Sequence, residues 1–201
     1  MKTSFILYCV SVLLIFTSCE SQKRPIKSQS EFQNQQNSFF KDASKSPLKS
    51  KDLKAFDGLD FFPIDSTFVV EAQLKRTPNT PFFDMKTTTN RVTQERVFGV
   101  LSFTINNESY NLNVYQSAPD SDAELDYLFL PFLDATNGTE TYGGGRYIDL
   151  TIPEGNQIAV DFNTSYNPYC AYNEKFSCPI VPIENYLPLK MNAGVKSFKD
   201  H

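Results

Sequence analysis

Histidine is nearly absent from this chain of 201 residues, and tryptophan is missing altogether. The single histidine, His201, is the last residue, and chain ends are poorly held in most domains. Catalysis by a Ser–His or Cys–His pair therefore lacks its general base, and a zinc site lacks most of its usual ligands. Because there is also no dinucleotide fingerprint and no metal-ligand spacing, we expect no metal and no cofactor. The lack of tryptophan also disfavours a sugar-binding platform, although tyrosine can serve there.

Basic residues are scarce in most of the chain. Residues 56–201 hold ten Lys or Arg against nineteen Asp or Glu. A protein that binds nucleic acid presents a basic face to the phosphates. We therefore expect no nucleic-acid partner.

A hydrophobic run long enough to span a membrane is missing as well. The uncharged run Phe5–Phe16 follows Lys2 and is shorter than the roughly 20 residues that a spanning helix needs. It fits the apolar region of a secretory signal. Its end, Phe16–Cys19, reads FTSC and resembles the lipobox of bacterial lipoproteins, which are cleaved before a cysteine that then carries diacylglycerol and a further acyl chain such as palmitate.

These features predict a lipoprotein. We expect a signal peptide at residues 1–18, lipidation of Cys19, and a lipid anchor that holds the protein to a membrane without spanning it. The predicted location is the bacterial cell envelope, with the domain facing the periplasm or the outer surface. The alternative is an ordinary cleaved signal that happens to end near an unrelated cysteine.

Cysteine is also sparse, with four in the chain. Cys9 leaves with the signal and Cys19 is lipidated, so Cys170 and Cys178 remain. Two cysteines in an exported domain predict a disulfide rather than a metal site. Closing such a short loop would stabilise the fold by roughly 2–3 kcal/mol on the chain-entropy model.

The composition divides the rest of the chain into a tether and a domain. Residues 19–45 are rich in Ser, Gln, Asn and Lys, so we predict a disordered, lipidated tether that cannot bury enough apolar surface to fold. Residues 46–201 are expected to form one domain. The pair Ser46 and Pro47 predicts the start of a short helix, and Gly58 can end it.

Strand signals dominate the remaining sequence. The clearest is a hairpin, Arg96–Ile105 and Tyr110–Tyr115 around an Asn-Asn turn. No long segment shows a helical period. The fold class predicted is mainly β: a single antiparallel β-barrel or sandwich-like domain with a short N-terminal helix. Further strands are expected at Thr67–Leu74, Phe82–Thr87, Leu128–Leu130, Tyr147–Ile152, Ile158–Phe162 and Leu187–Met191.

Several phrases in the domain can now be read together. They are Gly58–Asp65, Leu130–Gly138, Glu140–Leu150, Asp161–Asn163, Tyr166–Pro168, Cys170–Tyr172, Cys178–Pro179 and Glu184–Asn185. In this order they resemble the bacterial and archaeal family called domain of unknown function 1684 (DUF1684), over roughly residues 45–197. The resemblance implies a shared polar motif and no established reaction or ligand. It also implies that the cysteine pair need not be oxidised, since members occur without lipoprotein signals.

The polar phrases supply the candidate site. The run Gly143–Gly145 gives the backbone freedom to approach a ligand, and Arg146 follows it. The run is either an anion-binding nest or a bulge before a strand, and Arg146 is either a ligand contact or a buried partner of a carboxylate. We predict a ligand-binding set consisting of Arg146, Asp149, Asp161, Asn163, Tyr166, Asn167 and Glu140.

Three functions remain open from the sequence. The leading hypothesis is a membrane-anchored module that binds a small ligand in a polar pocket around Arg146, Asp161 and Asn163. The second is a hydrolase that uses two carboxylates, drawn from Asp134, Glu140, Asp149, Asp161 and Glu184. The third is a structural or interaction protein whose polar residues fix long loops. No catalytic residue can be named.

Overall fold

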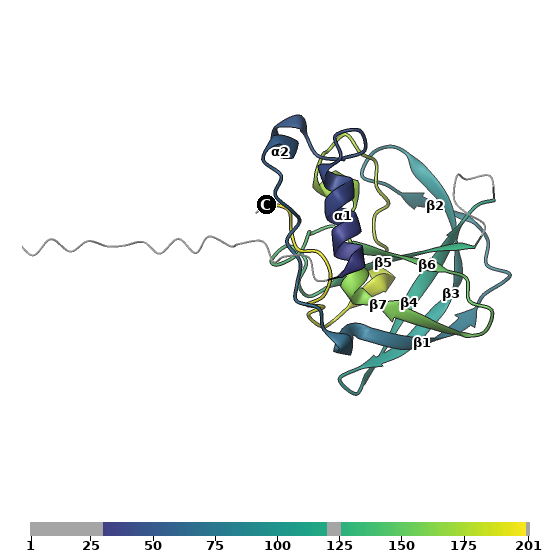
Figure 1. The fold of residues 1–201 in the computed structure, drawn as a ribbon. Helices are drawn as coiled ribbons and strands as arrows, with labels where there is room; N and C mark the ends of the chain where they lie inside the picture. Colours follow the sequence, from purple (N-terminus) through teal and green to yellow (C-terminus); the bar gives the residue numbers. More distant parts are fainter. Residues whose placement is uncertain (1–29, 120–125, 200–201) are drawn as a thin grey trace, which may run out of the picture.

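The computed structural model describes residues 30–119 and 126–199. The signal peptide, Cys19 and the first part of the predicted tether lie outside the described residues. The strands form one curled sheet, an open half-barrel in which the main sheet order is β6-β5-β4-β3-β1-β7 (Figure 1). All pairs in this path are antiparallel, while the two-residue β8 pairs with β5 in parallel. The prediction of a mainly antiparallel β fold is confirmed.

Each predicted strand has a counterpart, although the last is much shorter than expected. The strands are β1 (Val69–Arg76), β2 (Phe83–Lys86), β3 (Val92–Ile105), β4 (Glu108–Ser117), β5 (Tyr127–Asp134), β6 (Arg146–Thr151), β7 (Gln157–Asp161) and β8 (Tyr186–Leu187). The helices are α1 (Glu31–Lys41), α2 (Ser50–Lys54) and the single 3₁₀ turns η1 (Ser66–Phe68), η2 (Phe162–Thr164), η3 (Tyr169–Ala171) and η4 (Ile183–Asn185).

The β3–β4 hairpin follows the turn chemistry of its sequence. Asn106 and Asn107 both have positive φ, 53° and 65°, as a tight primed turn requires. Further along, a register shift beside Gly99 marks a bulge. A Cβ at Gly99 would lie 2.8 Å from the Lys75 backbone oxygen of the neighbouring strand β1, so a larger residue at position 99 would force the two paired strands to shift. Bulges bend and twist a strand, and this one contributes to the curl of the sheet.

The sheet is buried on both faces in the region of β5. Leu128, Leu130 and Phe132 belong to the main core inside the curl. Strand side chains alternate between faces, so Tyr127 and Phe129 point to the other side, where Phe129 packs with Tyr115, Tyr147 and residues of a covering loop. That loop spans residues 165–182, and it creates a second layer outside the sheet.

The N-terminal helix α1 corrects the predicted tether, which is wrong for residues 31–41. Ser30 caps α1 through a 3.2 Å bond from the Gln33 backbone N–H to Ser30 Oγ. Phe40 is only 2 % exposed and its ring lies 4.6 Å from that of Tyr172 in an edge contact. Because Phe32 shares the helix face with Phe40, the segment buries an aromatic stripe despite its polar composition.

The predicted helix after the tether is also displaced. It was expected to start at Ser46-Pro47, whereas α2 begins at Ser50. Leu53 and Phe56 still pack in the cluster that holds Phe40. In the part of the chain that the structure describes, no helix is long and apolar enough to cross a membrane.

Candidate functional site

Arg146 begins β6 and is fully buried, at 0 % exposure. Its Nη2 donates to Asp134 Oδ2 at 2.9 Å and to the Met191 carbonyl at 2.8 Å. Its Nη1 donates to the carbonyls of Ala193 and, at 3.4 Å, Val195. Asp134 in turn accepts the Met191 backbone N–H at 3.2 Å. We call these five residues the arginine anchor, which ties β5 and β6 to the C-terminal segment.

The ligand role predicted for Arg146 is therefore wrong. Both terminal nitrogens of the guanidinium are used by the protein itself, and no part of the side chain reaches solvent. The alternative reading, a buried partner of a carboxylate, is confirmed by the 2.9 Å ion pair with Asp134.

Asp161, Asn163 and Asn167 also hold the backbone rather than a cavity. Asp161 Oδ1 caps η2 by accepting the Asn163 backbone N–H at 2.9 Å. The Asn163 amide pairs with Asp65, accepting its N–H at 3.0 Å and donating to its carbonyl at 2.9 Å. Asn167 is 1 % exposed and donates to the Lys196 carbonyl at 2.9 Å. Asp161 thus fixes a local turn, while Asn163 and Asn167 fix distant segments to one another, so the predicted ligand role of these three residues is not supported by their geometry.

Glu140 lies at the surface. Its Oε1 accepts from Lys190 Nζ at 2.9 Å. Hydrogen bonding from Thr139, followed by Lys190, lowers the pKa of Glu140. The carboxylate is exposed and paired, and it lines neither of the two cavities described below.

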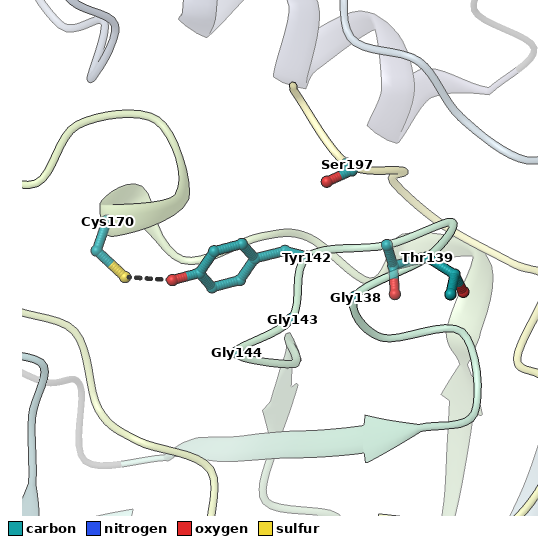
Figure 2. Close-up of a pocket in the computed structure, with 8 residues that line it drawn as sticks. Gly138, Thr139, Tyr142, Gly143, Gly144, Cys170 and Ser197 are labelled. Atoms are coloured by element: carbon teal, nitrogen blue, oxygen red, sulfur yellow. Dashed lines mark hydrogen bonds between the residues drawn. The ribbon is translucent and has the colours of Figure 1, made fainter. Parts of the chain in front are cut away.

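The glycine run borders a cavity of about 440 Å³, which we call the glycine-loop cavity (Figure 2). Gly145 has φ +89°, and a Cβ there would lie 2.6 Å from the Phe132 carbonyl oxygen, so this glycine lets the loop enter β6. Gly143 and Gly144 are exposed and line the cavity together with Tyr142 and Cys170. Gly145 thus forms a tight turn into β6, while Gly143 and Gly144 form part of the cavity wall.

Cys170 and Cys178 are free thiols in the structure, so the predicted disulfide is not formed there. The Cys170 backbone N–H donates to Cys178 Sγ at 3.2 Å. The Tyr142 hydroxyl lies 3.7 Å from Cys170 Sγ, and Figure 2 shows the two groups pointing toward each other. A hydrogen bond from the Cys178 thiol, helped by Tyr142, lowers the pKa of Cys170 to about 6, and the same interaction raises that of Cys178. Both shifts favour ionisation of Cys170 over that of Cys178.

The second cavity, of about 330 Å³, lies on the outer face of the sheet beneath the covering loop. We call it the tyrosine cavity, because four tyrosines and one phenylalanine supply much of its wall. No lysine or arginine contributes to it. Its lining residues are Glu95, Ser117, Tyr127, Phe129, Tyr147, Tyr166, Pro168, Tyr169, Ser177, Cys178 and Pro179.

Strand register explains why these side chains meet. Glu95 of β3 is paired directly with Ser117 of β4. Tyr127 and Phe129 are two residues apart on β5, so they share a face. On β6, Tyr147 points the same way, and its backbone pairs with Tyr166 of the covering loop through bonds of 2.9 and 3.0 Å. Four strands and one loop thus build the wall.

Glu95 is the unusual member of this wall. It is a carboxylate that is only 4 % exposed, and Ser117 Oγ lies 3.0 Å from each of its oxygens. Burial raises the pKa of Glu95, and the hydrogen bond from Ser117 lowers it in part. Among the described residues no lysine or arginine forms an ion pair with Glu95.

Three of the four tyrosine hydroxyls of this cavity donate to partners in the protein. Tyr127 and Tyr166 both donate to Asp149 Oδ1, at 2.8 and 2.6 Å. Tyr147 donates to the Pro179 carbonyl. Burial, followed by the charge of Asp149, raises the pKa of Tyr127 and of Tyr166. The hydroxyls therefore remain protonated donors at neutral pH.

The predicted ligand set thus separates into two groups. Tyr166 lines the tyrosine cavity, and Asp149 binds two of its tyrosines. The other five members lie elsewhere. The sequence reasoning missed Glu95, Ser117, Tyr127 and Tyr147. The continuous apolar and aromatic sequence of β5 is typical of a strand buried on both faces. No local pattern marked Glu95 or Ser117.

Carboxylate pairs for a hydrolase do not assemble from the set named by the sequence. None of Asp134, Glu140, Asp149, Asp161 and Glu184 lines either of the two cavities described here. Within residues 30–119 and 126–199, no group of three or more His, Cys, Asp or Glu is placed to hold a metal ion.

Comparison with known proteins identifies the family. The family model described as "Protein of unknown function (DUF1684)" matches residues 54–196. The chain belongs to the DUF1684 family. No curated protein matches it. Among solved structures, it is similar to an uncharacterised protein of Haloarcula marismortui determined by solution NMR, with 34 % identity and a TM-score of 0.67 over 84 % of this chain and 92 % of the other.

The DUF1684 match locates the site within the family's own region. It includes every residue that lines the tyrosine cavity and all five residues of the arginine anchor. Helix α1 lies before the match. The resemblance read from the sequence phrases is therefore confirmed at the level of the family and of the fold.

Proposed function

We propose that this DUF1684 protein is a lipid-anchored binding protein of the bacterial cell envelope, and that its small ligand occupies the tyrosine cavity. The volume of about 330 Å³ falls at the lower end of the range of ligand sites, which are lined mainly by apolar and aromatic side chains with a few polar groups. The polar pocket first expected around Arg146 is replaced by this aromatic one.

The observation that carries the proposal is the buried carboxylate of Glu95. Removing a charge from water costs free energy unless the charge is paired and hydrogen-bonded. Glu95 has Ser117 as its hydrogen-bond donor, and its side chain faces a cavity rather than a packed core. Such a perturbed carboxyl group in a concave site is typical of functional positions.

The binding proposal is tested by a ligand screen. Thermal unfolding of the full chain in a mild detergent is measured against a library of small molecules. We expect ligands that raise the midpoint of unfolding, because binding to the folded state stabilises it. The shift should be lost in Tyr127→Ala and kept in the matched variant Tyr186→Ala, which alters an exposed tyrosine of β8. A screen without a ligand, or shifts that survive Tyr127→Ala, would contradict the proposal.

The anchor is tested separately. The lipobox-like FTSC sequence supports lipidation at Cys19. We expect incorporation of a labelled palmitate analogue into the wild type and into Cys170→Ser, and none into Cys19→Ser, which should also leave the membrane fraction. Equal labelling of Cys19→Ser would show that the cysteine is not the lipid site.

A further inference from the structure

We infer that the ligand of the tyrosine cavity is an organic amine that binds as its ammonium cation, with the charge beside Glu95 and the apolar part against the aromatic rings. The inference rests on the proposed function and assigns the chemical class of its ligand. Three features of the wall carry it: its charge, its hydrogen-bonding capacity and its rings.

The charge of the wall is negative and lacks a cation. Glu95 is in the wall, and the exposed carboxylate of Asp149 lies next to the wall, where it accepts from Tyr127 and Tyr166. Among the residues that the structure describes, neither carboxylate is in an ion pair. A cationic ligand supplies the missing partner, whereas an anion would add a like charge to a buried site.

The hydrogen-bonding capacity of the wall consists mainly of acceptors. The hydroxyls of Tyr127, Tyr166 and Tyr147 already donate to protein oxygens, and the Ser117 hydroxyl faces Glu95. An ionised carboxylate has room for about four hydrogen bonds, so Glu95 retains places after Ser117. A ligand that brings N–H donors matches this wall.

The rings complete the match. Phe129 and Tyr147 meet edge to face with centroids 4.8 Å apart, and Tyr147 meets Tyr166 in the same way at 5.9 Å. Rings set at right angles present both faces and edges to the cavity. Ring faces attract ammonium groups through their quadrupole, and the same rings bury the apolar part of the ligand.

The experiment compares two probes that differ in charge and little in shape. Phenethylamine is protonated at neutral pH, and 2-phenylethanol is its neutral counterpart. Binding of each to the full chain in mild detergent is measured by calorimetry. We expect the amine to bind at least about tenfold more tightly than the alcohol, since a hydrogen bond to a charged group contributes a factor of that order or more.

The variants locate the charge that matters. The affinity of Glu95→Gln for the amine should be about tenfold to a hundredfold lower than that of the wild type, and so close to its affinity for the alcohol. The affinity for the alcohol should be the same in the variant and the wild type. Glu71→Gln, which changes an exposed glutamate of β1, is the matched control and should leave both probes unchanged. Circular dichroism confirms that each variant is folded.

The other outcomes separate this inference from the proposed function. Equal affinity of the two probes, or amine binding that survives Glu95→Gln, overturns the amine inference and leaves a cavity that binds neutral ligands. Binding of neither probe overturns it too, while a Tyr127-dependent ligand from the screen would keep the proposed function. If the screen finds no such ligand either, both the amine inference and the proposed function are overturned.

Discussion

Arg146 and Glu95 are both charged side chains buried in the same sheet, yet the protein satisfies them to different degrees. Arg146 has an ion pair with Asp134 and carbonyl acceptors from the C-terminal segment. Glu95 has one serine hydroxyl and no cation among the described residues. The first lies in a packed interior and the second faces a cavity.

This difference gives a criterion for telling a buried polar residue of the framework from one in a binding site. A buried charge with an ion pair and several hydrogen bonds in a packed interior fixes the chain, because its loss leaves those partners without a bond. A buried charge without a counter-ion next to a cavity carries a cost that a ligand can offset. By this criterion the arginine anchor belongs to the framework of the fold, and the tyrosine cavity is the site that we propose for a ligand.

The largest effect is expected from Arg146→Ala. Removal of one partner of a buried ion pair costs about 3–5 kcal/mol, because Asp134 and the carbonyls of Met191 and Ala193 lose their donor. Urea unfolding measures the loss. Lys190→Ala, which breaks the exposed pair with Glu140, should cost at most about 1 kcal/mol. If the two variants were equally stable, Arg146 would contribute no more to the fold than an exposed ion pair does, and the contrast between Arg146 and Glu95 would fail.

Asn185, a second buried side chain bonded to several backbone groups, extends the comparison to an uncharged group. Asn185 is 0 % exposed, accepts the Asn113 N–H at 2.9 Å, and donates to the carbonyls of Asn113 and Pro131 at 2.8 and 2.6 Å. We expect Asn185→Ala to lower the free energy of unfolding by about 2–3 kcal/mol, since buried groups are left unsatisfied. The exposed Asn192→Ala should lie within about 0.5 kcal/mol of wild type. If Asn185→Ala lowered the free energy of unfolding by no more than Asn192→Ala does, other contacts would be holding β4 and β5 together.

These framework contacts show what the sequence could and could not predict. Local rules located the strands and the Asn106-Asn107 hairpin, because alternation and turn chemistry depend on neighbouring residues. Arg146 was misjudged because its carbonyl acceptors come from residues 191–195, more than forty positions away, where nothing in the local pattern points to it. Its nearness to Gly143–Gly145 indicated a ligand loop instead.

The helix α1 and the tyrosine cavity were missed for related reasons. Composition alone made residues 19–45 a tether, although Phe32 and Phe40 lie on one helical face and have the Tyr172 region to pack against. Glu95 sits in a strand where a charged residue normally faces solvent. Its burial depends on the covering loop of residues 165–182, which a local pattern cannot place over β3.

Glu95→Gln should have the opposite sign from the framework variants. Burial raises the folded-state pKa of Glu95 above its ordinary value of 4.5, so ionisation of Glu95 opposes folding. The contribution of the carboxyl group to stability is complete below the unfolded-state pKa and is lost as pH rises through the folded-state pKa. We therefore expect Glu95→Gln to be more stable than wild type at neutral pH, with the gain vanishing in acid.

Urea unfolding over a series of pH values measures this gain, with the exposed Glu71→Gln as control. Its size should be smaller than the loss in either framework variant. A Glu95→Gln protein that is less stable than wild type at neutral pH would place Glu95 with Arg146 in the framework and would leave the cavity without its distinguishing charge.

The smallest effect on stability is expected from changes to Cys170 and Cys178. The reactivity of these two thiols tests the part of the molecule where the two cavities approach each other. Cys170 lines the glycine-loop cavity, and the buried Cys178 lines the tyrosine cavity. Because the pKa of Cys170 is lowered to about 6 by the Cys178 thiol and Tyr142, the rate of alkylation of Cys170 by iodoacetamide should rise with pH and reach half its maximum near pH 6. Mass spectrometry of peptides identifies the modified residue.

The matched variant for this measurement is Cys178→Ala, which removes the thiol donor. The midpoint for Cys170 should then move to higher pH, because the thiolate loses its largest stabilising contact. Cys178 in the wild type should react slowly at neutral pH, since its hydrogen bond to Cys170, followed by burial, raises its pKa. If both cysteines react alike with midpoints in the ordinary thiol range, the two sulfurs do not share a proton. The thiol of Cys178 would then not lie against Cys170, and this part of the wall of the tyrosine cavity would be less ordered than the arginine anchor.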